Sequence, residues 1–389
     1  MSRPPVVSTR PSTTDAATER RVPAPIRAAV VIALLFLFLV GVGLLESGIN
    51  ALGSDVQEEL FSSVSNPMAG LFVGILATVL AQSSSVTTST IVGLVGAGLL
   101  GIDDAVPMIM GANIGTTVTN TLASLGHLRR PAEFRLAFAA ATVHDAFNLL
   151  AVSVLLPIEL LTGVLSSAAE FLTELLVGGS GAEFDSPFKA AVKVPVGWVE
   201  ELWGDVVGLE GTLLGVVLVV TGLAAIFLAL TFVTKNMRQL IAARVERSIN
   251  AMLGRGGGVP AILLGVIITV AVQSSSITTS IMIPLSAAGV VSLVNAYPVT
   301  LGANVGTTIS ALLASLATDR PEALTVALVH TLFNVAGILL FYPVPALRRL
   351  PIRIAEGLAE MAARRRSMVI GYVIVTFLVI PAIGVILLR

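Results

Sequence analysis

Two short runs of amide and hydroxyl side chains could do chemistry in this chain. Gln82–Ser89 reads Gln-Ser-Ser-Ser-Val-Thr-Thr-Ser, and Gln273–Ser280 repeats it 191 residues later with isoleucine in place of valine. Both runs lie in apolar sequence, where such groups are costly unless something polar uses them. The duplication indicates two related halves. Two polar tips that meet within a membrane would form a site for an ion or a small polar solute.

A glycine-rich motif follows each run at the same spacing. Gly111–Thr117 (Gly-Ala-Asn-Ile-Gly-Thr-Thr) recurs as Gly302–Thr308 with valine for isoleucine. Glycine pairs allow a helix to unwind, so that backbone groups turn toward a ligand. Free N–H groups at half-helix ends favour an anion, whereas freed carbonyls and hydroxyls suit Na⁺. No Lys or Arg lies near either motif. An anion here would therefore depend on helix dipoles, hydroxyls and co-bound cations.

Each of these groups also has a structural interpretation. Serines and threonines in membrane helices commonly bond to their own helix, and small residues permit close packing. Two copies of Gln-Ser-Ser-Ser argue against that interpretation for the tips. Asn113 and Asn304 could cap a broken helix, with or without a ligand. His144 and His330 are expected to be structural hydrogen-bonders, because no cluster of histidines or carboxylates supports a metal.

Asp145 follows the first of these histidines, and its counterpart in the second half is the uncharged Thr331. A carboxylate inside a membrane helix is a functional candidate by default. The alternative is a structural pairing with Arg135 or another neighbour. The difference between the halves bears on how many cations they bind.

The elements that position these residues must be membrane helices. The chain has 389 residues, of which 55% are hydrophobic and 12% charged, and its mean hydropathy is +0.94. No Asp, Glu, Lys or Arg occurs between Glu59 and Asp103 or between Arg255 and Asp319. One span needs roughly 20 apolar residues, so each stretch holds more than one element. The net charge of −1 argues against a nucleic-acid partner, and the absence of cysteine excludes disulfides, thiolate metal sites and cysteine nucleophiles.

The charges along the chain predict an all-α polytopic membrane protein. Cytoplasmic flanks are enriched in Lys and Arg, so the helix with His144 should run outward and the helix with His330 inward. Two inverted-topology repeats are therefore predicted, as in transporters that alternate access around a central site. The expected segments are a disordered basic cytoplasmic tail (1–27), repeat 1 (28–158), an external loop (159–210), repeat 2 (211–345), a basic cytoplasmic segment (346–367) and a terminal transmembrane helix (368–389).

Between the flanking helices of each repeat, about 60 residues must make an odd number of net membrane crossings. The economical solution is a re-entrant helical hairpin followed by one glycine-broken transmembrane helix. In the first repeat, half-helices over 67–80 and 87–100 would meet at Gln82–Ser85, and the break would fall at Gly111–Thr117. The second repeat follows the same plan, with its break at Gly302–Thr308.

These motifs closely resemble those of the type II sodium–phosphate cotransporter family. The resemblance covers about residues 60–160 and 210–385, with the motifs in order, in duplicate and separated by a long external loop. The matching stretches are Gln82–Ser85, Gln273–Ser276, Gly111–Thr116, Gly302–Thr307, Phe138–Asn148, Leu155–Glu159, Ala296–Pro298, His330, Phe333–Ile338 and Val344–Leu347.

The resemblance implies Na⁺-driven symport of inorganic phosphate into the cell by alternating access, with Na⁺ as coupling ion, no cofactor and no enzymatic activity. It also implies electrogenic transport, because electroneutral relatives carry Gly where Asp145 stands. The candidate phosphate-binding residues are Gln82, Ser83, Ser84, Ser85, Asn113, Ser274, Ser275, Ser276 and Asn304. The candidate sodium-binding residues are Thr116, Asp145, Asn148, Gln273, Ser274 and Thr307.

The expected partners are phosphate, sodium ions and the lipid bilayer, with no nucleic acid, and a homodimer is left open. The cysteine-free external loop lacks the disulfide of animal relatives, which favours a multi-pass bacterial inner-membrane protein with a cytoplasmic N-terminus. Two positions depart from the family pattern. Ala303 stands where many relatives have Ser, and Arg130 stands where animal members often have an acidic residue.

The sequence offers three alternatives to this function. A sodium-coupled carrier of another small oxyanion would use the same architecture. An intramembrane hydrolase would pair a serine with His144 or His330, but no serine lies in a nucleophile elbow and the His–Asp pair is adjacent in sequence. A purely structural scaffold would need no buried hydroxyl runs.

Overall fold

The computed structural model describes residues 23–52, 66–177, 187–253, 258–365 and 367–388, and all regular structure in these ranges is helical. The predicted all-α class is confirmed. Most of the predicted disordered tail (1–27) lies outside the described residues.

Five helices in the described part are long and apolar enough to cross a membrane, which makes this a multi-pass membrane protein. Their sequences explain this, because each holds an 18-residue window with at most two charged residues. The five helices are α1 (Ala24–Ala51), α7 (Pro131–Thr162), α10 (Gly211–Leu253), α14 (Pro321–Phe341) and a terminal helix made of α16 (Ser367–Ile374), a π-helical segment (Val375–Val379) and α17 (Ile380–Leu388).

Four shorter helices form two pairs around the duplicated polar runs. Their lengths of 13 to 15 residues correspond to roughly 20 Å at 1.5 Å per residue, which is less than the ~30 Å hydrocarbon layer. These lengths agree with the half-helices expected from the sequence. The first pair is α3 (Pro67–Ala81) and α4 (Ser84–Gly96), and the second is α11 (Val259–Val272) and α12 (Ser275–Ala287).

The predicted glycine-broken helix is right for the first half and wrong for the second. In the first half α5 (Ile102–Gly115) ends at the glycine motif, and the chain resumes after Thr116–Thr117 as α6 (Val118–Ser124), followed by a 3₁₀ turn (Leu125–His127). In the second half α13 (Leu293–Ser315) runs through Gly302–Thr308 without a break.

Close packing explains the glycines that do not unwind the helix. A Cβ atom at Gly302 would lie 1.9 Å from the carbonyl oxygen of Ile262 in α11, and one at Gly111 would lie 2.0 Å from that of Leu71 in α3. Both distances are far below van der Waals contact, so α13 meets α11, and α5 meets α3, backbone to backbone, as at small-residue interfaces of membrane helices.

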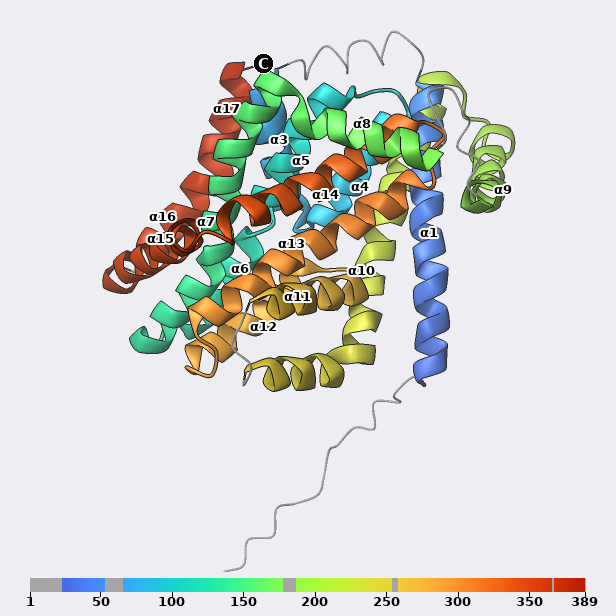
Figure 1. The fold of residues 1–389 in the computed structure, drawn as a ribbon. Helices are drawn as coiled ribbons and strands as arrows, with labels where there is room; N and C mark the ends of the chain where they lie inside the picture. Colours follow the sequence, from blue (N-terminus) through green and yellow to red (C-terminus); the bar gives the residue numbers. More distant parts are fainter. Residues whose placement is uncertain (1–22, 53–65, 178–186, 254–257, 366, 389) are drawn as a thin grey trace, which may run out of the picture.

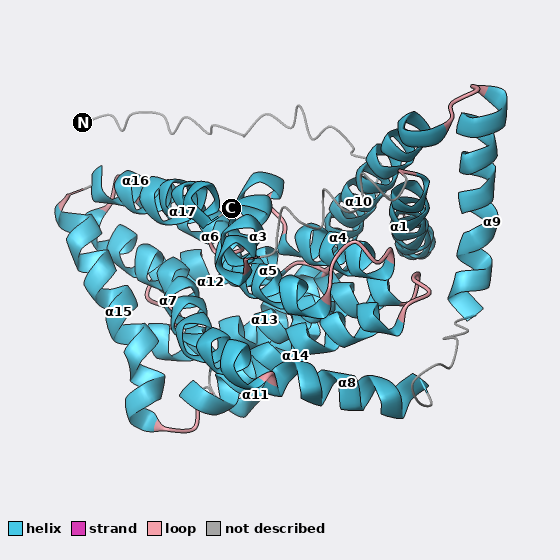
Figure 2. Ribbon diagram, turned by 90° about the horizontal axis from the view of Figure 1, so that it is seen from above, coloured by secondary structure: helices cyan, strands magenta, loops and turns pink. Residues whose placement is uncertain are grey.

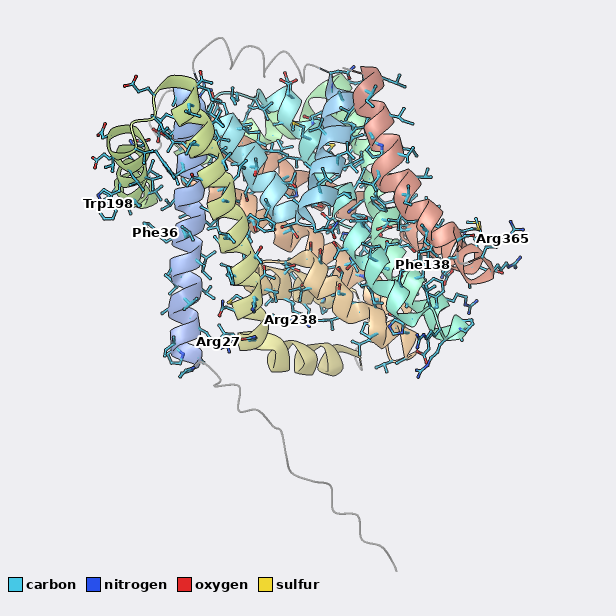
Figure 3. The ribbon with its side chains drawn as sticks, turned by 180° about the vertical axis from the view of Figure 1, so that it is seen from behind. Arg27, Phe36, Phe138, Trp198, Arg238 and Arg365 are labelled. Carbon is cyan, nitrogen blue, oxygen red and sulfur yellow. The ribbon has the colours of Figure 1, made fainter. Side chains whose placement is uncertain are left out.

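The short helices lie among the long ones. α1 and α10 lie side by side at one edge, and the terminal helix lies at the opposite edge (Figures 1 and 2). Between them α4 packs on α13 and α14, and α12 packs on α6 and α7. Arg27 at the start of α1 and Arg238 in α10 lie toward the same end of the molecule (Figure 3).

The segments predicted as an external loop (159–210) and as a basic cytoplasmic segment (346–367) contain helices. The range 159–210 holds α8 (Val164–Val177), α9 (Pro187–Glu201) and a π-helical segment (Leu202–Val206), and most of 346–367 belongs to α15 (Pro345–Arg364). α8 packs on α14, α15 packs on α7, and α9 stands outside α1 (Figure 2).

Candidate functional site

A glutamine turns the chain at the tip of each short helix pair. Gln82 (φ 53°) and Gln273 (φ 56°) are the non-glycine residues with positive φ in the described chain. Each donates its side-chain amide to the carbonyl three residues earlier, at Val79 (2.6 Å) and Val270 (2.7 Å). This bond caps the first helix of the pair, and strained tips of this kind are typical of functional sites.

The amide oxygens of the two glutamines also have equivalent partners. Thr119 donates to Gln82 Oε1 at 3.2 Å, and Ser310 donates to Gln273 Oε1 at 3.1 Å. Thr119 and Ser310 are 191 residues apart, which is the spacing of the duplicated motifs. Each tip is therefore held by a later helix of its own half, α6 for Gln82 and α13 for Gln273.

The serine after each glutamine starts the next helix. Ser83 accepts a hydrogen bond from the N–H of Val86 (3.3 Å), and Ser274 accepts one from that of Ile277 (3.4 Å). These are N-caps, for which serine is among the preferred residues. Each cap satisfies one of the first N–H groups of α4 or α12, and the others have no partner inside the helix.

The two tips line one cavity of about 180 Å³. This is well above the ~10–15 Å³ that one water needs. Side chains of α10 complete the wall opposite the tips. The lining residues are Gln82, Ser83, Ser84, Ser85, Gln273, Ser274, Ser275 and Ser276, with Leu230, Thr231 and Thr234 of α10.

This lining favours a small anion accompanied by a cation. Two helix N-termini face the cavity, which gives it positive potential without a charged side chain. The hydroxyls of Ser84, Ser85 and Ser275 are largely buried and offer donors for oxyanion oxygens as well as lone pairs for Na⁺. The predicted meeting of the tips is thus present in the structure, whereas the role of each residue stays a prediction.

The predicted asparagine ligands do not line the cavity. Asn304 Oδ1 accepts a hydrogen bond from His144 Nε2, and the Asn304 amide donates to Asn148 Oδ1 (2.7 Å). Asn148 in turn donates to the carbonyl of Asn113 (2.7 Å). His330 Nε2 lies 3.4 Å from Asn113 Oδ1. These five buried side chains form a network that joins the two halves, so both histidines are hydrogen-bonded as expected.

Thr116 and Thr307 are also separate from the cavity lining. Each donates its hydroxyl to the carbonyl four residues earlier, Ala112 and Ala303, at 2.9 Å. Both side chains are buried and each keeps lone pairs on its oxygen. The predicted sodium ligands therefore fall into separate places, with Gln273 and Ser274 at a tip, Thr116 at the end of α5 and Thr307 within α13.

Asp145 is fully enclosed, with 1% of its surface exposed. Its Oδ2 accepts hydrogen bonds from Thr121 (3.2 Å) and from Tyr372 of the terminal helix (2.9 Å), rather than from Arg135. Its Oδ1 has no hydrogen-bond partner. Among the described residues no cluster of three or more His, Asp or Glu forms a metal site.

Several residues of the site escaped the sequence prediction. The spacing of 191 residues could have identified Thr119 and Ser310, because these two positions are separated by the same number of residues as the two glutamines. No sequence signal identified Thr231 and Thr234, because α10 carries no duplicated polar run. Tyr372 also lies outside any duplicated polar run, so the sequence did not identify it either.

Comparison with known proteins identifies relatives over most of the chain. The family described as Na⁺/Pi-cotransporter matches residues 37–173 and 213–361. The sodium-dependent phosphate transport protein 2A of Ovis aries is 34% identical over 429 residues, covering 92% of this chain and 67% of the relative. The 2A protein of Rattus norvegicus is 35% identical (92% and 67%), and the 2B protein of Homo sapiens is 32% identical (91% and 64%). No solved structure matches.

Proposed function

Because the chain belongs to the Na⁺/Pi-cotransporter family, we propose that it carries inorganic phosphate into the cell together with sodium ions by alternating access. The relatives are sodium-dependent transporters and not enzymes. The chain is accordingly a sodium-coupled phosphate transporter with Na⁺ as its coupling ion.

The observation that carries the mechanism is the cavity shared by the two serine tips. Phosphate would lie between the N-termini of α4 and α12, with hydrogen bonds from Ser83–Ser85 and Ser274–Ser276. Two opposed helix dipoles attract the anion, and the absence of a charged residue in the lining lets it leave again. Sodium at Gln273 and Ser274 would supply the missing positive charge.

Exchanged contacts support inverted-topology repeats. α8 of the first half packs on α14 of the second, and α15 of the second packs on α7 of the first. His144 bonds to Asn304, and His330 lies at hydrogen-bond distance from Asn113. A two-fold axis in the membrane plane produces such reciprocal pairs. The hairpins α3–α4 and α11–α12 would then be re-entrant from opposite sides.

Asp145 and Asn148 would form a further cation site, and a net inward charge would make transport electrogenic. The membrane potential then contributes about 2.3 kcal/mol per charge per 100 mV. The basic flanks of α1 and α10 (Figure 3) support a cytoplasmic N-terminus. A bacterial inner membrane is the proposed location.

The serine tips can be tested by single hydroxyl deletions. Ser84→Ala and Ser275→Ala should each reduce sodium-dependent uptake of labelled phosphate into proteoliposomes by at least about tenfold, since each removes a hydrogen bond to a charged ligand. Ser153→Ala is the matched control, because that serine is exposed and bonds to its own helix at Leu149. Full uptake by both tip variants would contradict the proposed site.

The anion is tested in the same assay. Sulfate and arsenate are added as competitors of labelled phosphate, with and without a sodium gradient. Phosphate as the substrate predicts that unlabelled phosphate competes best. Absence of sodium-dependent uptake of labelled phosphate, or inhibition by another oxyanion at a lower concentration than by unlabelled phosphate, would contradict phosphate as the substrate.

A further inference from the structure

The terminal helix carries a tyrosine that reaches the buried carboxylate of α7. Tyr372 and Thr121 both donate to Asp145 Oδ2, at 2.9 and 3.2 Å. The Thr117 hydroxyl, which also lies beside this carboxylate, donates to the carbonyl of Ile114 at 2.8 Å. Asp145 Oδ1 has no hydrogen-bond partner, although it is buried. The carboxylate is thus held through one oxygen while the other keeps its lone pairs unused.

An unused carboxylate oxygen in a buried site is unfavourable unless a ligand completes it. A buried charge that lacks a partner costs several kcal/mol, and intramembrane carboxylates usually face a partner or an ion. Asn148 lies one turn further along α7, with its amide engaged by Asn113 and Asn304. A hard cation at Asp145 Oδ1 would supply the missing partner.

We propose that Tyr372 is a positioning residue for this cation site, and that its hydroxyl fixes the Asp145 carboxylate so that Oδ1 is presented to Na⁺. This inference rests on the proposed function. The tyrosine ring is itself held by edge-on contacts with Phe138 (centroids 6.3 Å apart) and Phe377 (5.9 Å). The aromatic contacts therefore set the place of the hydroxyl without help from the carboxylate.

Tyr372 reaches the site from outside both repeats. It lies beyond residues 213–361, where the family match ends, and in the helix that follows the second repeat. The counterpart of Asp145 in the second repeat is Thr331, which donates to the carbonyl of Ala327 in its own helix. The tyrosine thus bonds to the carboxylate of Asp145, in the half that carries this charged residue.

The hydroxyl can be removed without removing the ring. In Tyr372→Phe we expect the sodium concentration for half-maximal phosphate uptake to rise about threefold to tenfold, as loss of one hydrogen bond to a charged group predicts. The phosphate concentration for half-maximal uptake at saturating sodium should stay unchanged. Tyr297→Phe is the matched control, because the Tyr297 hydroxyl is buried without a partner and its loss should leave the sodium dependence unchanged.

Sodium binding is also measured without transport, as the rise in melting temperature of the purified protein with sodium in phosphate-free detergent. Tyr372→Phe and Thr121→Val should both need more sodium for the same rise. In an Asp145→Asn background, Tyr372→Phe should have no further effect, since the two residues act as one unit.

Two results would overturn the assignment: a wild-type sodium dependence in Tyr372→Phe, or a shift of equal size that persists in Asp145→Asn. The proposed function fails separately. A wild-type protein that is stabilised by sodium but takes up no phosphate would contradict the transport proposal. The role of Tyr372 would then be decided by the sodium-dependent melting temperatures alone.

Discussion

Alanine at Gly302 separates two explanations of the glycine motif, because they predict opposite signs for stability. If the glycine served to unwind α13, alanine would stabilise the helix by about 0.5–1 kcal/mol. If it permits close approach of α11, alanine must push that helix away. The unbroken course of α13 through Gly302 favours the second explanation.

The structure sets the size of the effect. The new Cβ would lie 1.9 Å from the carbonyl oxygen of Ile262, whereas ordinary contact begins at 3.4 Å, so α11 would have to withdraw by about 1.5 Å. The obstacle is backbone, which cannot rotate aside like a side chain. Overpacking typically costs about 1–3 kcal/mol, and we expect the upper part of that range. The tip at Gln273 would move with α11.

The assay combines melting temperature in detergent with phosphate uptake. Gly302→Ala should lower the melting temperature by roughly 2–4 °C per kcal/mol and reduce uptake by at least about tenfold, since displacements near 1 Å are costly in preorganised sites. Gly357→Ala is the matched control, because this helical glycine in α15 has nothing within 4 Å of its Cβ position. A Gly302→Ala protein that is as stable as the wild type, or more stable, would refute the packing argument.

Two further substitutions address the buried polar groups. Asp145→Gly should abolish the transport current under voltage clamp while part of the sodium-dependent uptake remains, because one negative charge leaves the proposed cation site; a persistent current would exclude Asp145 as its source. Asn304→Leu should destabilise the protein by about 1–3 kcal/mol for each group left unsatisfied, at His144 and Asn148. Its melting temperature is compared with that of Asn236→Leu, whose exposed amide bonds only to its own helix, and equal values would show that the network adds no stability.

The sequence was sufficient to predict the paired tips because their chemistry is duplicated. Gln82 and Gln273 stand in polar runs that are energetically unfavourable in hydrocarbon unless they bind a partner. The two runs and the two glycine motifs have the same spacing, which relates the two halves. The same spacing extends to Thr119 and Ser310, which hold the glutamine side chains. Spans with few charges, such as α1 and α14, were equally predictable from composition.

The break in only one of the two glycine motifs could not be predicted, because the motifs are nearly identical in sequence. The difference lies in tertiary contacts. Asn120, just after the break, donates to Thr279 (2.7 Å) and accepts from Ser280 (3.1 Å), both in α12. Its counterpart at the repeat spacing, Ala311, has no such group. Hydrogen bonds to α12 thus accompany the separate helix α6.

The site combines features that are duplicated with features that occur once, and the two kinds suit different tasks. An anion between two helix N-termini needs an equal contribution from each half, and Ser83 and Ser274 supply it with the same capping geometry. A net charge needs to be added only once. Asp145 has no acidic counterpart at Thr331, and its hydroxyl partner Tyr372 lies in the terminal helix. Equivalent serine substitutions should therefore weaken phosphate uptake to similar extents, whereas substitutions around Asp145 should act on sodium dependence and current.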